Sequence, residues 1–335
     1  MFSPLGNFIN FNLLIKDMKS ELKQIILNLN PALFNVKKII ISSFKKLGVG
    51  EGNINYVFKV NNKKFICRLN IESEKSDKVE REFKTLKKIE KYNFSPKPVY
   101  FNKNPEFSIL KFIEGKPFRQ GKRTYTSVQI KNIAKTLAKL HSIKTSIKPV
   151  NYDFEYYTHG AKHLITDLNK RTKNKFKKEL KQIFNVVLSS VPKNEIHKYS
   201  LIHGDVCPQN IVETAKDVRF IDWENVEVSD PARDIAQVII DLGLQKNYLV
   251  LFQKTYFSIR KDDSLFVRAR SYAILMMQNY YIWECIRALE VKNKELPKEY
   301  LQKTSVREHL IAAQKNLVDL NKLIPIPLFE VDMVC

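Results

Sequence analysis

The sequence lacks the features that mark disulfide-rich, zinc-binding or membrane-spanning proteins. Its four cysteines, at positions 67, 207, 285 and 335, form no Cys-x-x-Cys pair, which argues against a disulfide framework or a zinc site. No apolar run approaches the about 18 residues of a membrane span. The N-terminus lacks the basic leader of a signal peptide, and Cys335 stands at the wrong position for prenylation. We therefore expect a protein of a reducing compartment, the cytoplasm.

Acidic residues are also scarce, because 35 Asp and Glu stand against 57 Lys and Arg, for a formal net charge of +22. Such a charge could attract nucleic acid or an anionic membrane. The lysines, however, are spread along the chain among Asn and Ile, which is typical of compositional bias. The densest basic run, 170–181, predicts a solvated helix face. We therefore do not expect a nucleic-acid partner, and the sequence leaves the oligomeric state open.

The length and the core-forming residues suit one two-lobed enzyme or two modest domains. The chain has 335 residues, and 44% of them are hydrophobic. No internal repeat or low-complexity linker divides it. We expect an N-terminal helical extension over 1–37, a strand-rich domain over 38–113 and a mainly helical part over 114–335.

Two short segments carry the chemistry. Residues 203–210 read His-Gly-Asp-Val-Cys-Pro-Gln-Asn, and residues 221–224 read Ile-Asp-Trp-Glu. Each follows a short apolar, strand-like run, so its polar groups are expected at a loop edge that a ligand can reach. An acid, an amide and a second acid at this spacing suit phosphoryl transfer. Asp205 would accept a hydroxyl proton, while Asn210 and Asp222 would bind Mg²⁺ against a triphosphate.

This pattern resembles the signature of the aminoglycoside phosphotransferase and choline kinase superfamily, small-molecule kinases with a protein-kinase-like fold. Protein kinases have Arg in place of Gly204, and Phe-Gly in place of the Trp-Glu that follows Asp222. Both departures favour the small-molecule branch. The segment 230–236, Asp-Pro-Ala-Arg-Asp-Ile-Ala, resembles the family too, and the resemblance implies that Asp234 braces the catalytic loop from a helix start. His141, at a predicted helix end, resembles a structural family residue.

The resemblance implies an α+β fold with two lobes, a small antiparallel-sheet N-lobe and a larger, mainly helical C-lobe, and it implies ATP and Mg²⁺ as cofactors. Three of only nine glycines, Gly48, Gly50 and Gly52, lie with Asn53 between two strand-like runs. Successive backbone N–H groups in such a turn form an anion-binding concavity. An ordinary hairpin is the alternative. The family pattern favours a nucleotide-binding loop.

The family places a basic residue on the next strand and its glutamate partner on the following helix. We predict Arg68 as the phosphate ligand, with Lys64 on the same strand face as the competitor. Glu82 lies beside the apolar stripe of the predicted helix 78–91 and is the predicted ion-pair partner of Arg68, although a solvated helix charge is the commonest fate of a Glu. An apolar strand before a Gly–Pro break resembles the inter-lobe hinge, where the backbone of Lys111 to Ile113 would bind adenine.

The acceptor side is expected on the late helix 277–287, which concentrates Tyr280, Trp283 and Glu284. Choline kinases use aromatic and acidic residues on late helices to hold a quaternary ammonium. The favoured alternative is a packing stripe, since Tyr280, Trp283 and Arg287 follow i, i+3, i+7 spacing.

The resulting hypothesis is an ATP- and Mg²⁺-dependent phosphotransferase acting on an alcohol group of a small metabolite such as an amino-alcohol, amino sugar or sugar. Two alternatives stay open, an atypical protein kinase and a catalytically silent nucleotide- or nucleic-acid-binding module. The sequence does not identify the acceptor or separate ATP from GTP.

Overall fold

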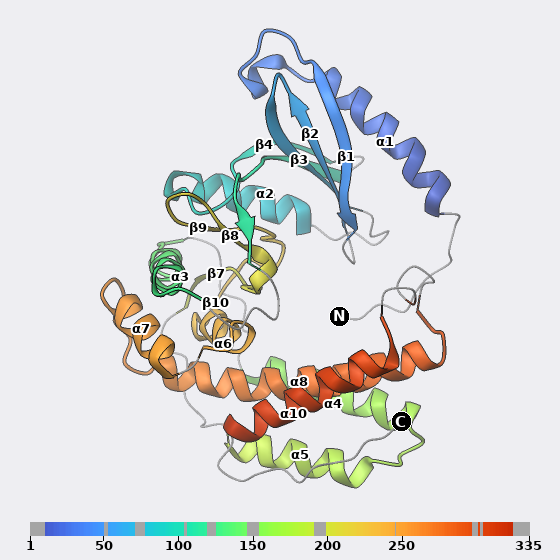
Figure 1. Ribbon diagram of the computed structural model, residues 1–335, viewed down its shortest axis with the longest axis vertical. Helices are drawn as coiled ribbons and strands as arrows, with labels where there is room; N and C mark the ends of the chain where they lie inside the picture. The colour runs from blue at the N-terminus through green and yellow to red at the C-terminus, as the bar shows by residue number, and fades with distance from the viewer. Residues whose placement is uncertain are drawn as a thin grey trace. The chain divides into compact units, whose positions relative to one another are not determined.

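The computed structural model describes residues 11–49, 53–70, 78–103, 106–118, 125–145, 154–190, 199–244, 246–296, 301 and 304–323. The chain divides into two compact units, Met1–Glu114 and Gly115–Cys335. The first holds a small antiparallel sheet and the second is mainly helical (Figure 1). The predicted α+β class is therefore confirmed.

The N-terminal unit is built on a five-stranded antiparallel sheet of order β1-β2-β3-β5-β4. Its helices are α1 (Phe11–Leu27) and α2 (Lys78–Ile89), with short 3-10 turns at Pro31–Phe34 and Glu90–Tyr92. Its strands are β1 (Ile41–Val49), β2 (Asn53–Val60), β3 (Lys63–Asn70), β4 (Pro98–Lys103) and β5 (Glu106–Lys111). Two-residue periodicity divides the side chains of each strand between the two faces.

Aromatic and aliphatic side chains fill one face of this sheet. Phe58 and Phe65 from adjacent strands stack at 5.6 Å between ring centroids, and Phe34 meets Phe65 edge-on at 5.1 Å. Leu22 and Ile26 of α1 belong to the same buried cluster, so this helix covers that face. Alternate residues of β3 point the other way, toward α2, which contacts β4 and β5.

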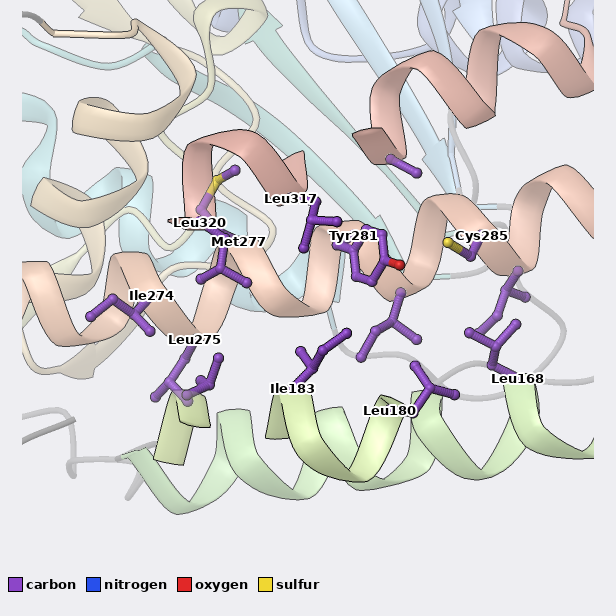
Figure 2. Packing of buried hydrophobic residues seen from close by; sticks show 14 residues of the cluster. Leu168, Leu180, Ile183, Ile274, Leu275, Met277, Tyr281, Cys285, Leu317 and Leu320 are labelled. Atoms are coloured by element: carbon purple, nitrogen blue, oxygen red, sulfur yellow. The ribbon is translucent and has the colours of Figure 1, made fainter. Parts of the chain in front are cut away.

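The C-terminal unit is organised around one long helix, α8 (Leu265–Lys292), which packs against α4, α5, α6 and α10. Its residues from Ser271 to Gln278 are all buried, so the middle of the helix is enclosed on every side. Figure 2 shows Leu168, Leu180 and Ile183 from two neighbouring helices beside Tyr281 and Cys285 of α8. The unit's other helices are α3 (Ser127–Leu140), α4 (Phe154–Arg171), α5 (Lys177–Ser190), α6 (Ala232–Asp241), α7 (Lys246–Phe257) and α10 (Val306–Leu323).

The prediction of a continuous helix over the basic run 170–181 is wrong. The helix α4 ends at Arg171 and α5 begins at Lys177. Between them Lys173 and Asn174 take positive φ angles of 51° and 62°, a backbone region that Asn tolerates better than most residues. The break lets the chain turn, and α4 and α5 both contact α8.

Two small sheets carry the segments that the sequence singled out. The strand β7 (Ser200–Ile202) pairs with β10 (Glu227–Ser229), and β8 (Ile211–Glu213) pairs with both β6 (Lys116–Pro117) and β9 (Val218–Phe220). Free thiols are present at Cys67, Cys207 and Cys285. A reducing compartment would preserve this state, but the location of the protein stays a prediction. Among the described residues, no helix combines the length and the apolarity that crossing a membrane requires.

Candidate active site

The loop after β7 turns sharply at a residue that must be glycine. Gly204 has a φ of +82°, and a Cβ there would lie 2.2 Å from the carbonyl oxygen of Asn225. A side chain is therefore excluded by both conformation and contact. The next residue, Asp205, thus enters a tight turn that begins at the end of a buried strand.

Asp234 fixes this turn from the first turn of α6. Its Oδ2 accepts the His203 backbone N–H at 2.8 Å, and its Oδ1 accepts that of Gly204 at 2.9 Å. His141 Nε2 adds a third bond to Oδ2 at 3.1 Å, and the Tyr256 hydroxyl lies 2.8 Å from His141 Nδ1. Burial acts to raise the pKa of Asp234, but the bonds from His141 and the backbone outweigh it and lower the pKa. The predicted bracing role of Asp234 and the structural role of His141 are confirmed.

His203 links the two predicted segments through both ring nitrogens. Its Nε2 lies 3.0 Å from the Ile221 carbonyl oxygen, and its Nδ1 accepts the Asp205 backbone N–H at 3.2 Å. These partners assign the neutral tautomer with the proton on Nε2, because a carbonyl can only accept and an N–H can only donate. The ring also packs on Trp223, with centroids 4.6 Å apart. The loop 203–205 is thereby tied to the chain immediately before Asp222.

The Asp205 carboxylate is held by two side-chain amides. Asn210 Nδ2 donates to Asp205 Oδ2 at 2.9 Å and to its carbonyl oxygen at 3.0 Å. Gln237 Nε2 donates to Asp205 Oδ1 at 2.7 Å. Each carboxylate oxygen therefore accepts one bond and retains lone pairs for a further proton. Because Asn210 turns its nitrogen toward Asp205, its amide oxygen faces the other way.

Asp222 reaches the same end of the β8–β9 hairpin. The Ile221 N–H donates to the Asn210 carbonyl oxygen at 2.9 Å. This backbone bond joins Asn210, one predicted metal ligand, to the residue that directly precedes Asp222, the other. Asp222 itself takes a φ of 65°, a conformation in which Asp is among the few tolerated side chains. Asp205 and Asn210 are thus in direct contact, and the hairpin brings Asp222 beside them along the backbone.

The donor set fits Mg²⁺. The described residues contain no cluster of three or more His, Cys, Asp and Glu side chains, of the kind that forms an all-protein metal cage. Mg²⁺ instead uses one or two carboxylates together with substrate phosphates and water. An amide oxygen from Asn210 and a carboxylate from Asp222 supply hard oxygen ligands of this kind. Their assignment as metal ligands stays a prediction.

A second carboxylate near Asp205 was missed from the sequence. Asp241 is the last residue of α6, one helical turn after Gln237. Burial and then the nearby charge of Asp205 raise the pKa of Asp241 to about 7, against the lowering effects of Gln237 and Lys315. A helical face could have suggested it, since 234, 237 and 241 follow i, i+3, i+7 spacing.

Tyr280 is the predicted acceptor residue that lies near enough to these acids for their charges to act on its hydroxyl. Burial raises its pKa well above the ordinary value, and the charges of Asp241 and Asp205 add to this. Burial also raises the pKa of the neighbouring Cys207 thiol to about 12, with a further contribution from Asp205. Cys207 is therefore a neutral thiol at neutral pH rather than a thiolate nucleophile.

The other two predicted acceptor residues face different partners. Glu284 Oε2 lies 2.5 Å from Nδ1 of His309 in α10, a hydrogen-bond contact. Trp283 lies under the guanidinium of Arg287, 4.9 Å from the ring centroid, and meets the His309 ring edge-on. Trp283 and Glu284 thus have packing and hydrogen-bond contacts within the helices, as the stripe alternative expects. Their role toward an acceptor stays a prediction with no contact to Asp205 or Asp241 to support it.

The N-terminal unit contains the ion pair expected for a nucleotide-binding strand. Arg68 Nε lies 3.2 Å from Glu82 Oε2, and the side chains are 7% and 1% exposed. Arg68 alternates with the buried Cys67 and Leu69, so it points to the sheet face opposite the aromatic cluster. Lys64 pairs with Glu114 at 3.0 Å near the surface. The pair with Glu82 is therefore made by Arg68 and not by the competitor.

The remaining nucleotide-side predictions are only partly covered by the described residues. Gly48 lies in β1 and Asn53 starts β2, where it is buried, whereas Gly50 and Gly52 lie outside the described residues. In the predicted hinge, the Lys111 N–H donates to the Lys97 carbonyl oxygen at 2.8 Å, and the Phe112 N–H donates to that of Lys64. The adenine prediction therefore depends on Ile113 rather than on the Lys111 N–H.

Comparison with known proteins gives a family match over most of the chain. The model of the phosphotransferase enzyme family matches residues 43–268. No curated protein sequence matches the chain.

Solved structures share the fold at low sequence identity. A choline/ethanolamine kinase family protein from Mesorhizobium loti is 16% identical, with a TM-score of 0.62 over 92% of this chain and 96% of that one. The choline kinase LicA from Streptococcus pneumoniae is 17% identical, with a TM-score of 0.58 over 90% and 99%. A spectinomycin phosphotransferase, solved with ADP and spectinomycin, is 13% identical, with a TM-score of 0.57 over 83% and 89%. At these identities the likeness shows the kinase-like fold.

Proposed function

Since the chain belongs to the phosphotransferase enzyme family, we propose that it transfers the γ-phosphoryl group of ATP to a hydroxyl of a small, positively charged metabolite. Amino-alcohols and amino sugars are acceptors of this class. The observation that carries the proposal is the Asp205 carboxylate, held by Asn210 and Gln237 on a loop that Asp234 braces. Such positioning supplies most of what phosphoryl transfer asks of a protein.

Asp205 is the proposed base. Its two oxygens are fixed by amide donors at 2.9 Å and 2.7 Å, so an acceptor hydroxyl can be oriented against a defined lone pair. In this arrangement Asp205 takes the hydroxyl proton as the oxygen attacks. The attacking oxygen becomes bonded to the transferred phosphoryl group, and ADP leaves.

Asn210 and Asp222 are the proposed ligands of Mg²⁺, which when bound would neutralise charge on the nucleotide phosphates. In the N-terminal unit, Arg68 is the proposed phosphate ligand. Its buried partner Glu82 fixes the direction of the guanidinium, so less side-chain entropy is lost on binding. The glycine-containing loop at 48–53 is proposed to add backbone N–H donors.

The charge around Asp205 supports a cationic acceptor. Asp241 is close enough to Asp205 for the two charges to interact, and burial raises the cost of ionising Asp241. A bound ammonium group would relieve that cost, because an opposite charge favours the ionised carboxylate. Tyr280 lies in the same electrostatic neighbourhood and offers an aromatic ring, to which a cation is attracted.

The test is ADP release by the purified protein with Mg²⁺ and ATP over a panel of acceptors. The panel contains choline, ethanolamine, thiamine and an aminoglycoside as cations, and uncharged sugars and peptide pools as contrasts. We expect turnover with a cationic member, dependent on Mg²⁺ and lost in Asp205→Asn. Turnover with peptides alone would favour the protein-kinase alternative. Nucleotide binding without turnover on any acceptor would contradict the proposal.

A further inference from the structure

A second polar contact joins the same strand and helix as the Arg68–Glu82 ion pair. Glu106, the first residue of β5, is half-buried and has one carboxylate oxygen on each of them. Its Oε2 accepts from Asn70 Nδ2, at the end of β3, at 2.6 Å. Its Oε1 accepts the Glu80 backbone N–H, in the first turn of α2, at 3.3 Å. One carboxylate therefore bridges β3 and α2.

Strand pairing places this bridge next to the ion pair. The strands β3 and β5 are antiparallel, with Arg68 opposite Ser108. Because side chains alternate along a strand, Arg68 and Asn70 lie on one face of the sheet, together with Ser108 and Glu106. The helix α2 packs on this face, through contacts with β4 and β5. The ion pair and the bridge are thus neighbours along the same face.

The chemistry of a carboxylate matches both partners of the bridge. The first N–H groups of a helix have no acceptor inside the helix, and a negative charge there complements the helix dipole. Glu106 supplies such an acceptor from a different element. The Asn70 amide fixes the second oxygen and so holds the carboxylate in the orientation that reaches the helix. The start of α2 is therefore hydrogen-bonded to the sheet as well as packed on it.

Two attachments constrain a helix more than one does. The Arg68–Glu82 pair alone fixes a single point, about which α2 could rotate. The Glu106 bridge fixes a second point, two residues earlier in α2, and so sets the direction from which Glu82 meets the guanidinium. A protein whose binding group is correctly placed in only a fraction of the molecules loses apparent affinity in proportion to that fraction.

We propose that Glu106 is a positioning residue for the nucleotide, which holds α2 against β3 so that Glu82 orients Arg68 toward the phosphates. The inference rests on the proposed function, in which Arg68 is a phosphate ligand. It assigns part of the affinity for ATP to a residue that acts through the Arg68–Glu82 pair.

Two variants of similar size separate the bridge from its charge. Glu106→Gln keeps an oxygen for the Glu80 N–H, and its NH₂ group can donate to Asn70 once the Asn70 amide turns its oxygen toward it. Glu106→Met keeps the length of the side chain and loses both bonds. In the full chain with Mg²⁺, we expect the Kd for ATP to rise about 10-fold in Glu106→Met and to stay within about 2-fold of wild type in Glu106→Gln. Isothermal titration calorimetry measures both.

A double-mutant cycle gives a readout that a purely structural role would not move. If Glu106 acts through the ion pair, Glu106→Met should weaken ATP binding far less in a Glu82→Gln background than in wild type. A general loss of stability would lower Tm and give the same fold-change in Kd in both backgrounds. Equal fold-changes, or wild-type affinity in folded Glu106→Met, would overturn the inference.

Lys84→Met is the matched control. Lys84 pairs with the Glu80 side chain at 2.6 Å and is itself 68% exposed. Its replacement removes a contact of the same residue but leaves the Glu80 N–H free to bond Glu106, so the Kd for ATP should not change. A rise as large as that in Glu106→Met would count against the bridge.

These measurements need no acceptor, so the inference and the proposed function can fail separately. ATP binding without turnover on any acceptor would count against the proposed function alone. Turnover together with an additive double-mutant cycle would count against the inference alone. A wild-type chain that binds no ATP would overturn both.

Discussion

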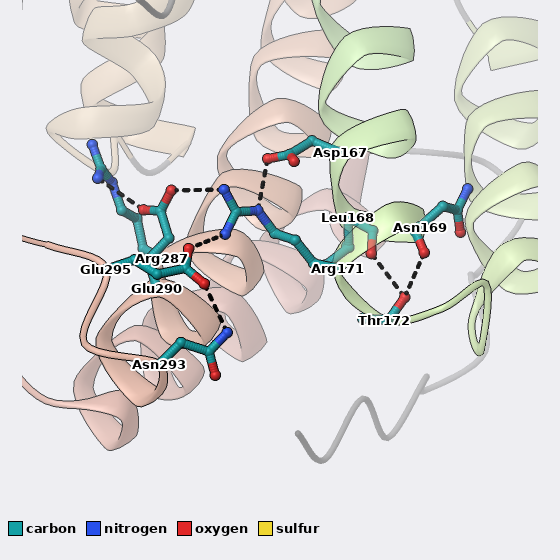
Figure 3. A network of polar contacts seen from close by, with 9 residues as sticks. All are labelled: Asp167, Leu168, Asn169, Arg171, Thr172, Arg287, Glu290, Asn293 and Glu295. Atoms are coloured by element: carbon teal, nitrogen blue, oxygen red, sulfur yellow. Dashed lines mark hydrogen bonds and ion pairs between the residues drawn. The ribbon is translucent and has the colours of Figure 1, made fainter. Parts of the chain in front are cut away.

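Two polar clusters of the C-terminal unit handle charge in opposite ways. In the loop cluster (His203, Asp205, Asn210, Asp234 and Gln237), the acids accept hydrogen bonds from backbone N–H groups, amides and histidine. In the Arg171 cluster, one guanidinium contacts Asp167, Glu290 and Glu295 at 2.9, 3.3 and 2.5 Å (Figure 3). Neutral donors orient a carboxylate without offsetting its charge, whereas a guanidinium offsets part of the charge of the carboxylates that it contacts.

The difference has a functional meaning in a chain of net charge +22. Cations are plentiful in this sequence, yet Asp205 and Asp234 are held by neutral donors. A carboxylate held in this way keeps its negative charge for a ligand, which in the proposed function would be a proton, a metal ion or an acceptor's ammonium group. In the Arg171 cluster each carboxylate is already paired with a guanidinium, and these pairs link α4 with the C-terminal end of α8.

The largest expected effect follows replacement of the proposed base. Asp205→Asn keeps the shape of the side chain but removes the proton acceptor, so kcat should fall by about 10³-fold or more while nucleotide affinity is retained. Single-turnover kinetics and nucleotide titration measure the two quantities separately. A variant that retains kcat would show that the charge preserved in the loop cluster is not used in catalysis.

Replacement of Asp234, which braces the loop, should give the next largest effect, in this case on stability. Asp234 accepts from two backbone N–H groups and from His141, whereas Asn offers one acceptor oxygen and an NH₂ that would face another donor. Asp234→Asn should therefore lower the free energy of unfolding by about 3 kcal/mol, as measured by urea denaturation. A loss below 1 kcal/mol would mean that neutral donors do not anchor the loop.

Much of this cluster was predictable, because local sequence encodes it. The spacing of Asp205, Asn210 and Asp222 follows from a short loop and a hairpin, and Asp234 was identified through the family resemblance. Gln237 and Asp241 were missed, since their roles arise only when one face of α6 packs against the loop. Composition could not reveal that packing.

The fold shows the same division between features that local sequence encodes and features that depend on distant contacts. The resemblance implied the α+β class, and alternation along 53–70 is consistent with the strands found there. The sheet order β1-β2-β3-β5-β4 depends on contacts distant in sequence. The turn at 172–176 was missed because its lysines and asparagine do not interrupt a helical pattern as Gly or Pro would.

Asp241 should give a pH-dependent effect of intermediate size. Its pKa is raised to about 7 in the folded protein, so the folded state binds a proton more tightly than the unfolded state, in which the pKa is about 4. This carboxyl therefore lowers stability progressively as pH rises from about 4 to 7, and by a constant amount above pH 7.

Asp241→Asn removes this penalty. The variant should be more stable than wild type at pH 8, by on the order of 2 kcal/mol, with the difference shrinking toward pH 5.5. Thermal unfolding at both values measures it. The same variant should raise the KM for a cationic acceptor. If Asp241→Asn and wild type were equally stable at pH 8, the Asp241 carboxylate could not be a buried, uncompensated charge.

The smallest effect is expected where charges are already paired. Arg171 is 24% exposed, and two of its partners, Asp167 and Glu295, are each 43% exposed, so solvent screens the cluster. Arg171→Met keeps the aliphatic stem and should cost about 0.5 to 1 kcal/mol, with kcat unchanged and the cost smaller in 1 M NaCl. Urea denaturation at both salt concentrations measures this. A different result would be that Arg171→Met destabilises the protein as much as Asp234→Asn, with no dependence on salt. In that case the two clusters would not differ in the way their contacts indicate, and neutral donors would have no special part in keeping charge available at the site.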